Sequence, residues 1–141
     1  MRVKTLKIRE KTKGTCDIIN ITPKVQEQLE GEKIRQGQAS LFVSGSTAAL
    51  TTIEYESGLV QDLTEFLEKI IPSDRRYHHD ERWDDDNGFS HLRAALLGPS
   101  LQVPIEHGRL LLGTWQQIVL LDFDNRPRTR EVLIQIMGEV E

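Results

Sequence analysis

Strand-like runs occupy both ends of this chain, and its clearest helical repeat lies between them. Alternating apolar and polar residues predict a strand over 3–8 and a second over 15–21, which we expect to return as a hairpin. Three further β-like runs cover 101–106, 110–122 and 130–140. Strands at both ends with helices between them indicate an α+β domain, whose curved mixed or antiparallel sheets form a sandwich-like core.

The middle of the chain supplies the two or three predicted helices. Thr22 offers a capping hydroxyl and Pro23 suits the first helical position, whereas Ser90 is expected to cap a short third helix. The second helix is the clearest, because its apolar residues recur at helical spacing between acidic and basic ones. We expect helices over 22–31, 59–70 and 91–97, and further strands over 39–43 and 50–55.

Composition bounds the class of protein. A chain of 141 residues with 38% apolar content suits one globular domain over 1–141. The net charge of −4 argues against a general nucleic-acid binder, which would show a basic face. The single cysteine, Cys16, cannot form an internal disulfide, and no signal-peptide pattern opens the chain, so we expect a cytoplasmic protein. No apolar run approaches the ~20 residues that span a bilayer, so no membrane partner is expected.

A polar segment over 77–91 concentrates the residues best suited to chemistry, including three of the four histidines and a run of acids. Imidazoles are the commonest metal ligands and proton shuttles, and carboxylates add oxygen ligands or orient the rings. His79 and His91 lie twelve positions apart, so they share a site only if the segment folds back. Asn87 and Gly88 suit the tight turn that this requires. Surface histidines on a solvated acidic loop are the alternative.

A break between two predicted strands places Ser46 and Thr47 after Gly45. Small residues there would let backbone N–H groups point at a ligand, and the two hydroxyls could donate to phosphate oxygens. No P-loop motif follows, and a plain turn is the alternative. Glu54, in the next strand, faces either a wet cleft or the solvent side of the sheet.

Alternating basic residues near the end of the chain suggest a second place for phosphate. Arg128 and Arg130 share one face of an extended segment, and guanidinium groups bind phosphate bidentately. Asp122 and Asp124 could instead hold both arginines in ion pairs. The sequence leaves these two interpretations open.

The run over 110–122 carries a pair of hydrogen-bonding side chains. Thr114 and Gln116 are two positions apart and therefore share a face of the predicted strand. Trp115, between them, is expected to pack in the core.

Several of these stretches resemble the YjbQ-like proteins, a family whose members are often labelled secondary thiamine-phosphate synthases. The most specific are Leu-Gly-Thr-Trp-Gln over 112–116 and Asn-Gly-Phe-Ser-His-Leu-Arg-Ala-Ala-Leu-Leu-Gly-Pro-Ser over 87–100. Residues 44–54, 77–79 and 124–130 add to the resemblance, which covers most of the chain from Ala39 onward. It implies a compact α+β fold with a sandwich-like sheet, assembled as a homotrimer.

The resemblance also implies a site. Its clustered polar residues fall here on His79, His91 and Glu54 as ligands of a divalent metal, Mg²⁺ or Zn²⁺, with His91 and Glu54 as the catalytic pair. The implied substrate- or phosphate-binding residues are Ser46, Thr47, Asn87, Thr114, Gln116, Arg128 and Arg130. Many relatives carry histidine where this chain has Gly45, so Glu54, His78 or a water would have to replace that ligand.

The implied activity couples a hydroxymethylpyrimidine diphosphate with a thiazole phosphate, and the substrates are therefore phosphorylated small molecules. A non-catalytic trimer that binds a metal, phosphate or metabolite is one alternative. A metal-dependent hydrolase is another, which would need three protein ligands and an open position on the metal.

Overall fold

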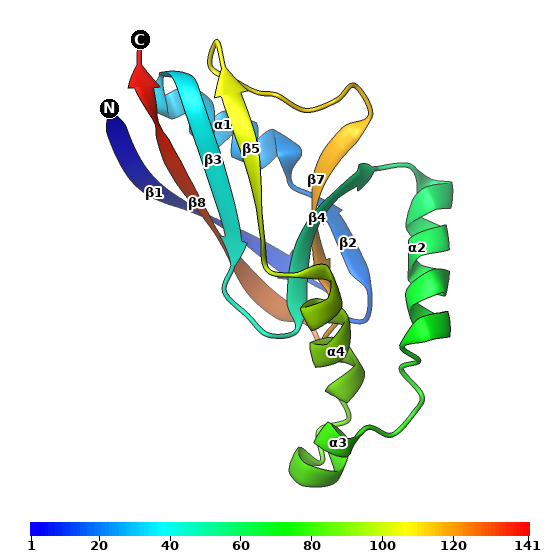
Figure 1. The fold of residues 1–141 in the computed structure, drawn as a ribbon. Helices are drawn as coiled ribbons and strands as arrows, with labels where there is room; N and C mark the ends of the chain where they lie inside the picture. Colours follow the sequence, from blue (N-terminus) through cyan, green and yellow to red (C-terminus); the bar gives the residue numbers. More distant parts are fainter.

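Two antiparallel β-sheets form the body of the structure, a computed structural model that describes residues 1–141 (Figure 1). The larger sheet has the strand order β1-β8-β3-β5-β6, and the smaller has the order β2-β7-β4. The strands of the larger sheet are β1 (Arg2–Thr12), β3 (Ile34–Val43), β5 (Ser100–Glu106), β6 (Arg109–Leu110) and β8 (Arg128–Val140). Those of the smaller sheet are β2 (Asp17–Asn20), β4 (Ala48–Glu54) and β7 (Gln116–Asp122).

The main core lies between the two sheets and follows from the alternation of side chains along each strand. In β8, Val132, Ile134 and Ile136 are fully buried in this core. The central strand of the smaller sheet is apolar on both faces. Ile118 belongs to the core between the sheets, whereas Val119 belongs to a second cluster on the other face, beneath the helices.

Four helices cover the ends and the outer face of this sandwich. Helix α1 (Thr22–Glu32) buries Val25 and Leu29 in the main core, whereas α2 (Ser57–Ile70) and α4 (Gly88–Leu97) pack on the smaller sheet through the second cluster. The short α3 (His78–Trp83) lies at the end of the molecule opposite both termini (Figure 1). None of the four combines the length and the apolar character that crossing a bilayer requires.

The α+β sandwich is confirmed, but the pairing of its first strands differs from the prediction. β1 pairs with β8 and β2 pairs with β7, so the expected hairpin between the first two strands does not form. Gly14, Thr15 and Cys16 all have positive φ angles. This short stretch carries the chain from one sheet to the other, and therefore the two strands cannot be neighbours.

Other differences concern segments whose local pattern was ambiguous. The single strand expected over 110–122 is divided into β6 and β7, and Trp115 lies in the connection, where it is 74% exposed rather than part of the core. The expected loop over 77–91 contains a helix that was not predicted, α3. Helix α4 begins at Gly88, so Ser90 lies inside it, and its hydroxyl donates to the Phe123 carbonyl instead of capping a helix.

Candidate functional site

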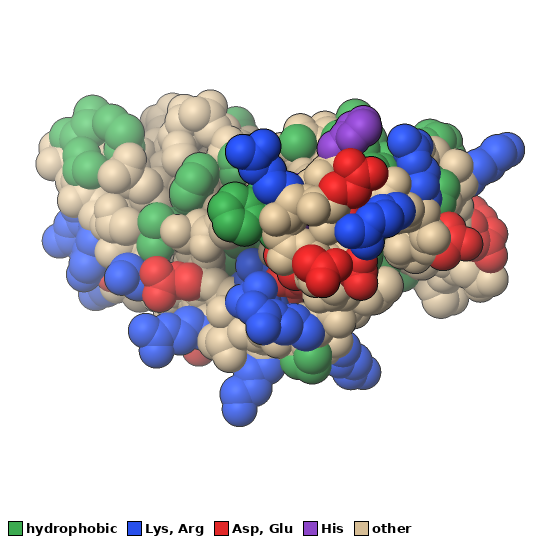
Figure 2. Space-filling model, turned by 90° about the horizontal axis from the view of Figure 1, so that it is seen from below, with side chains coloured by type: hydrophobic (Ala, Val, Ile, Leu, Met, Phe, Trp, Pro, Cys, Tyr) green, Lys and Arg blue, Asp and Glu red, His purple; other side chains and the backbone are tan.

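The short helix α3 and the start of α4 meet at one end of the molecule and bring His79 and His91 together. Their ring centroids lie 4.5 Å apart with the ring planes tilted by 38°. Viewed from this end, histidine reaches the surface beside acidic side chains, and lysines and arginines are spread over the same face (Figure 2). The segment over 77–91 therefore does fold back.

Local backbone geometry produces this return. Asp80, at the third position of α3, accepts a hydrogen bond from the backbone of Tyr77 and closes a capping box. Asp84 ends α3 in the left-handed conformation, and Asp86 adopts the same conformation just before α4 begins. Aspartate tolerates this conformation better than most residues, so the acidic run also provides the turn.

The inner nitrogen of His79 is the most unusual atom of the site. Its Nδ1 is buried and has no hydrogen-bond partner. The nearest acidic oxygens are Oδ1 of Asp85 at 3.5 Å and Oδ1 of Asp80 at 3.7 Å. These distances exceed a hydrogen bond of about 2.7–3.2 Å, whereas two atoms bound to one tetrahedral ion at ~2.1 Å lie about 3.4 Å apart. Ligand atoms of His79, Asp80 and Asp85 all lie within 4.8 Å of one another, so these are the residues that could hold a divalent cation.

His91 is held in its neutral form near neutral pH. Burial, and next the neighbouring His79, lower the pKa of His91 below 6.5. Asp85, Asp124 and the backbone of Ser46 act in the opposite direction but do not outweigh them. A neutral imidazole has a free lone pair, so His91 can bind a metal or accept a proton.

Two hollows flank the histidines and share His91 and Ala95. One, of about 340 Å³, is lined by both histidines together with Tyr77, His78, Gly88 and Leu92. The other, of about 270 Å³, is lined by Gly45, Ser46, Ala48, Ala94 and Pro99. Of the predicted phosphate-binding residues, Ser46 is therefore beside His91.

Beneath this site a buried charged network holds the predicted phosphate-binding arginines. Arg130 donates to both carboxylate oxygens of Asp122 at 2.8 Å and to the Thr47 hydroxyl at 2.6 Å. Arg128 donates to Asp124 at 2.7 Å through Nε and at 2.6 Å through Nη2. Both aspartates are fully buried and Arg130 is 7% exposed. Both arginines are therefore held in ion pairs, Arg128 by Asp124 and Arg130 by Asp122. The burial of Arg130 and Thr47 argues against phosphate binding by these two residues.

Asn87 also belongs to this network rather than to an open surface. Its side chain is buried, and its amide donates to Asp124 at 3.3 Å. Turning the amide over would instead place its nitrogen 3.0 Å from a carboxylate oxygen of Asp85. The first orientation joins Asn87 to Asp124, which follows β7, and the second joins it to Asp85 within the acidic segment, so both contacts are structural.

Glu54 does not join the histidines within this chain, which corrects its predicted place as a ligand and catalytic residue. Ala48, at the start of β4, lines the hollow beside His91, whereas Glu54 ends the same strand and pairs with Gln116. Six residues of strand at ~3.3 Å each separate the two ends by about 20 Å. The direction of β4 therefore carries Glu54 away from the histidines.

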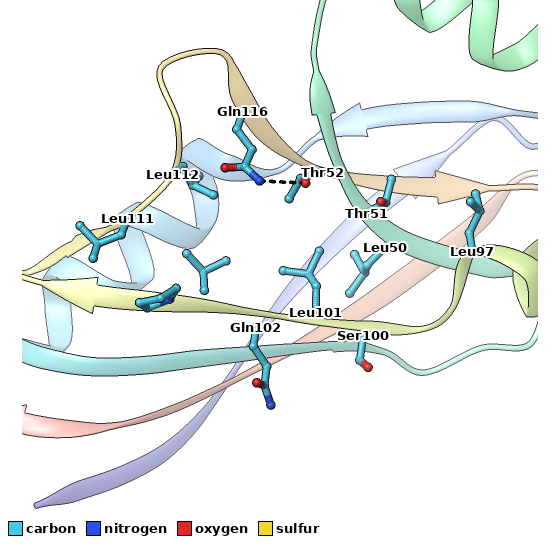
Figure 3. Close-up of a pocket in the computed structure, with 12 residues that line it drawn as sticks. Leu50, Thr51, Thr52, Leu97, Ser100, Leu101, Gln102, Leu111, Leu112 and Gln116 are labelled. Carbon is cyan, nitrogen blue, oxygen red and sulfur yellow. Dashed lines mark hydrogen bonds between the residues drawn. The ribbon is translucent and has the colours of Figure 1, made fainter.

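Gln116 instead lines a separate cleft of about 310 Å³ between β4 and β5 (Figure 3). Its amide donates to the Thr52 hydroxyl at 3.0 Å and accepts from the backbone of Gly113 at 3.0 Å. Thr114 lies exposed in the connection before β7. These two predicted residues are thus not brought to the histidines either.

Sequence reasoning missed the specific parts that Asp80, Asp85 and Asp124 play around the histidines. The acidic run was recognised as a possible source of ligands, but its members could not be ranked without the turn geometry. Asp124 approaches from the end of β7, far along the chain, and no local pattern could have indicated it.

Comparison with known proteins agrees with this fold. The family described as "UPF0047 protein YjbQ-like" matches residues 4–139. The chain belongs to the YjbQ-like family. A UPF0047 protein from Archaeoglobus fulgidus is 42% identical over 127 residues, covering 90% of this chain and 96% of the relative. Another from Methanothermobacter thermautotrophicus is 38% identical over 139 residues, covering 99% of this chain and 95% of the relative.

Solved structures of similar proteins share the YjbQ-like architecture. A hypothetical protein from Aeropyrum pernix K1 matches with a TM-score of 0.89 at 31% identity, covering 96% of this chain and 99% of its own. A protein of unknown function from Sulfolobus solfataricus matches with a TM-score of 0.87 at 30% identity, covering 98% and 100%. The family and the fold are thus established together, and none of these relatives is named for a reaction.

Proposed function

We propose that this YjbQ-like protein is a divalent-metal-dependent enzyme whose metal is held by His79 and Asp85, with His91 beside them as the proton acceptor. The observation that supports this most is the buried Nδ1 of His79, which has no hydrogen-bond partner and lies 3.5 Å from a carboxylate oxygen of Asp85. Buried polar atoms are almost always hydrogen-bonded, and a bound cation would satisfy this one. Asp85 replaces Glu54 in the ligand set because it is 49% exposed in its side chain and adjoins both rings.

The chain's own residues then divide the work. When bound, the metal would polarise a phosphate oxygen or acidify a water molecule. His91, neutral near pH 7, would accept or return a proton in the hollow that it shares with His79. Ser46 and the apolar wall of Ala94 and Pro99 would contact the rest of the substrate.

For the reaction we propose the thiamine-phosphate synthase type. The thiazole nitrogen would bond to the methylene carbon of the pyrimidine as the bond from that carbon to the diphosphate oxygen breaks. Two hollows beside His91 give room for flat rings, and a cation at His79 would neutralise the leaving diphosphate. Of the two arginines predicted to bind phosphate, Arg128 is the one whose side chain is partly exposed and could approach an anion.

Metal titration of metal-free protein tests the proposal directly. Isothermal titration with Zn²⁺ and with Mg²⁺ should show one site per chain, and binding should be lost in His79→Ala and weakened in Asp85→Asn. His107→Ala is the matched control, because His107 lies in the turn between β5 and β6 and lines a different hollow. Absence of a site in the wild-type protein, or undiminished binding by His79→Ala, would refute the metal centre.

Substrate assays then separate the reactions. A synthase should release diphosphate from the two thiamine precursors and lose this activity in His91→Ala. A hydrolase should cleave phosphate esters, lose activity to a chelator and regain it with one metal. Tight metal binding without either turnover would favour the non-catalytic binding protein instead.

A further inference from the structure

We infer that Asp80 is the positioning residue that assembles the two-histidine centre by fastening the start of α3 to the start of α4. The inference rests on the proposed function for its significance. Its evidence is the geometry of the chain alone, because His79 and His91 belong to different helices and something must hold those helices in register.

The Asp80 carboxylate makes both connections at once. One oxygen accepts a hydrogen bond from the backbone N–H of Tyr77 at 2.9 Å, and the other accepts from the backbone N–H of Gly88 at 2.8 Å. The side chain is 3% exposed, so water does not replace either contact. His79 directly precedes Asp80, and His91 follows Gly88 by three residues, which is about one helical turn. Fixing these two N–H groups therefore fixes both imidazoles.

The glycine at the start of α4 shows how closely the two segments approach. A Cβ atom at Gly88 would lie 2.8 Å from the Cβ of Tyr77 and 3.2 Å from the Cβ of His79. Contacts this short force a shift of backbone-attached atoms rather than of a flexible side-chain end. The absence of a side chain at position 88 is thus a second requirement for the same arrangement, and the added Cβ would also lie 3.0 Å from Oδ1 of Asp80.

Asp80 and Asp85 consequently have different tasks although both lie near Nδ1 of His79. Both oxygens of Asp80 already accept hydrogen bonds from N–H groups at ordinary distances, and its side chain is enclosed. Asp85 is half exposed, and its Oδ1 lies 3.5 Å from Nδ1 of His79. Asp80 acts on the centre through the positions of the two histidines, whereas Asp85 is available as a ligand.

The test is an NMR titration of the His91 ring in metal-free protein. Four groups face that ring: His79, Asp85, Asp124 and the backbone of Ser46. Removing a nearby carboxylate should by electrostatics alone lower the pKa of His91 further. Release of α3 should instead raise it toward 6.5, because His91 loses its burial and the neighbouring imidazole. The direction of the change therefore separates positioning from charge.

We expect Asp80→Ala to raise the pKa of His91 and Glu81→Ala, the control that removes the next acid on α3, to leave it unchanged. Gly88→Ala keeps the carboxylate and the net charge and should raise the pKa as well. It decides the matter if Asp80→Ala fails to fold. A His91 pKa that is unchanged or lowered in Gly88→Ala and in any folded Asp80→Ala overturns the inference.

Metal affinity is a second measurement, and its outcome is independent of the His91 titration. If the wild-type protein binds Zn²⁺, Asp80→Ala and Gly88→Ala should raise the Kd about 10–100-fold, as loss of supporting contacts around a metal does. If the wild-type protein binds no metal, the proposed function fails, while the His91 titration still decides whether Asp80 sets the pairing of the rings.

Discussion

Replacing Asp122 with alanine should destabilise the fold strongly, because it leaves the Arg130 guanidinium buried without its partner. Arg130 donates two hydrogen bonds of 2.8 Å to this carboxylate, which is fully buried. Breaking one side of a buried ion pair costs about 3–5 kcal/mol. With an unfolding entropy of about 2.1 cal/mol/K per residue over 141 residues, this loss corresponds to a fall in Tm of roughly 10–17 °C.

Urea unfolding followed by circular dichroism measures this change at constant protein concentration. Glu131→Ala is the control, because Glu131 pairs with Lys7 and Arg9 at the surface and should cost at most about 1 kcal/mol. Replacing both buried partners, Asp122→Leu with Arg130→Met, should recover much of the loss, since no charge is left unpaired. A cost below about 1 kcal/mol for Asp122→Ala would contradict a structural role for the buried ion pair, and Arg130 would again be a candidate for anion binding.

Three further predictions concern stability, each measured by urea unfolding. Burial raises the pKa of Asp124, but hydrogen bonds, led by the one from Arg128, outweigh it and hold this pKa below 3.8. The ionised Asp124 therefore stabilises the fold fully above pH 3.8, and this contribution is lost as the pH falls through the lowered pKa. Asp124→Asn should flatten this dependence of the unfolding free energy on acid pH. Arg93→Met should cost about 1–3 kcal/mol, because removing the buried guanidinium leaves the Ile71 carbonyl without its two hydrogen bonds; a cost near zero would contradict this. Gly37→Ala should destabilise the fold by at least about 2 kcal/mol, because the added Cβ would lie 2.1 Å from the Met137 carbonyl oxygen. Gly31→Ala is the control: its Cβ would meet open space, and the substitution should stabilise the fold by about 0.5–1 kcal/mol.

The fold class and most elements were predictable because they depend on local periodicity. The helix from Thr22 and the long helix before Pro72 were found from capping residues and apolar spacing, and both exist. Strand partners are not a local property, so the expected hairpin was wrong while both of its strands were found. Trp115 was misplaced for a related reason, since an indole gives no sign of whether its segment is a strand or a surface connection.

The candidate site was predictable in composition but not in detail. The pairing of His79 with His91 needed a tight turn, which was expected at Asn87 and Gly88 but is made by Asp84 and Asp86, whose φ angles are positive. Glu54 does not reach the two histidines because of the direction of β4. Whether Arg130 is free to bind an anion depends on a carboxylate from another strand, Asp122. The metal, the reaction and the trimeric assembly stay predictions.

The position of β8 has a consequence for how the protein forms during translation. This strand is the last element of the domain, yet it lies between β1 and β3 in the interior of the larger sheet. The first strand therefore has no partner until residues 128–138 are available to pair with residues 2–12. Contacts of such long sequence separation fold slowly, and an unpaired strand is prone to aggregate. Synthesis of β8, rather than growth of an early hairpin, should thus be the step that commits the domain to folding.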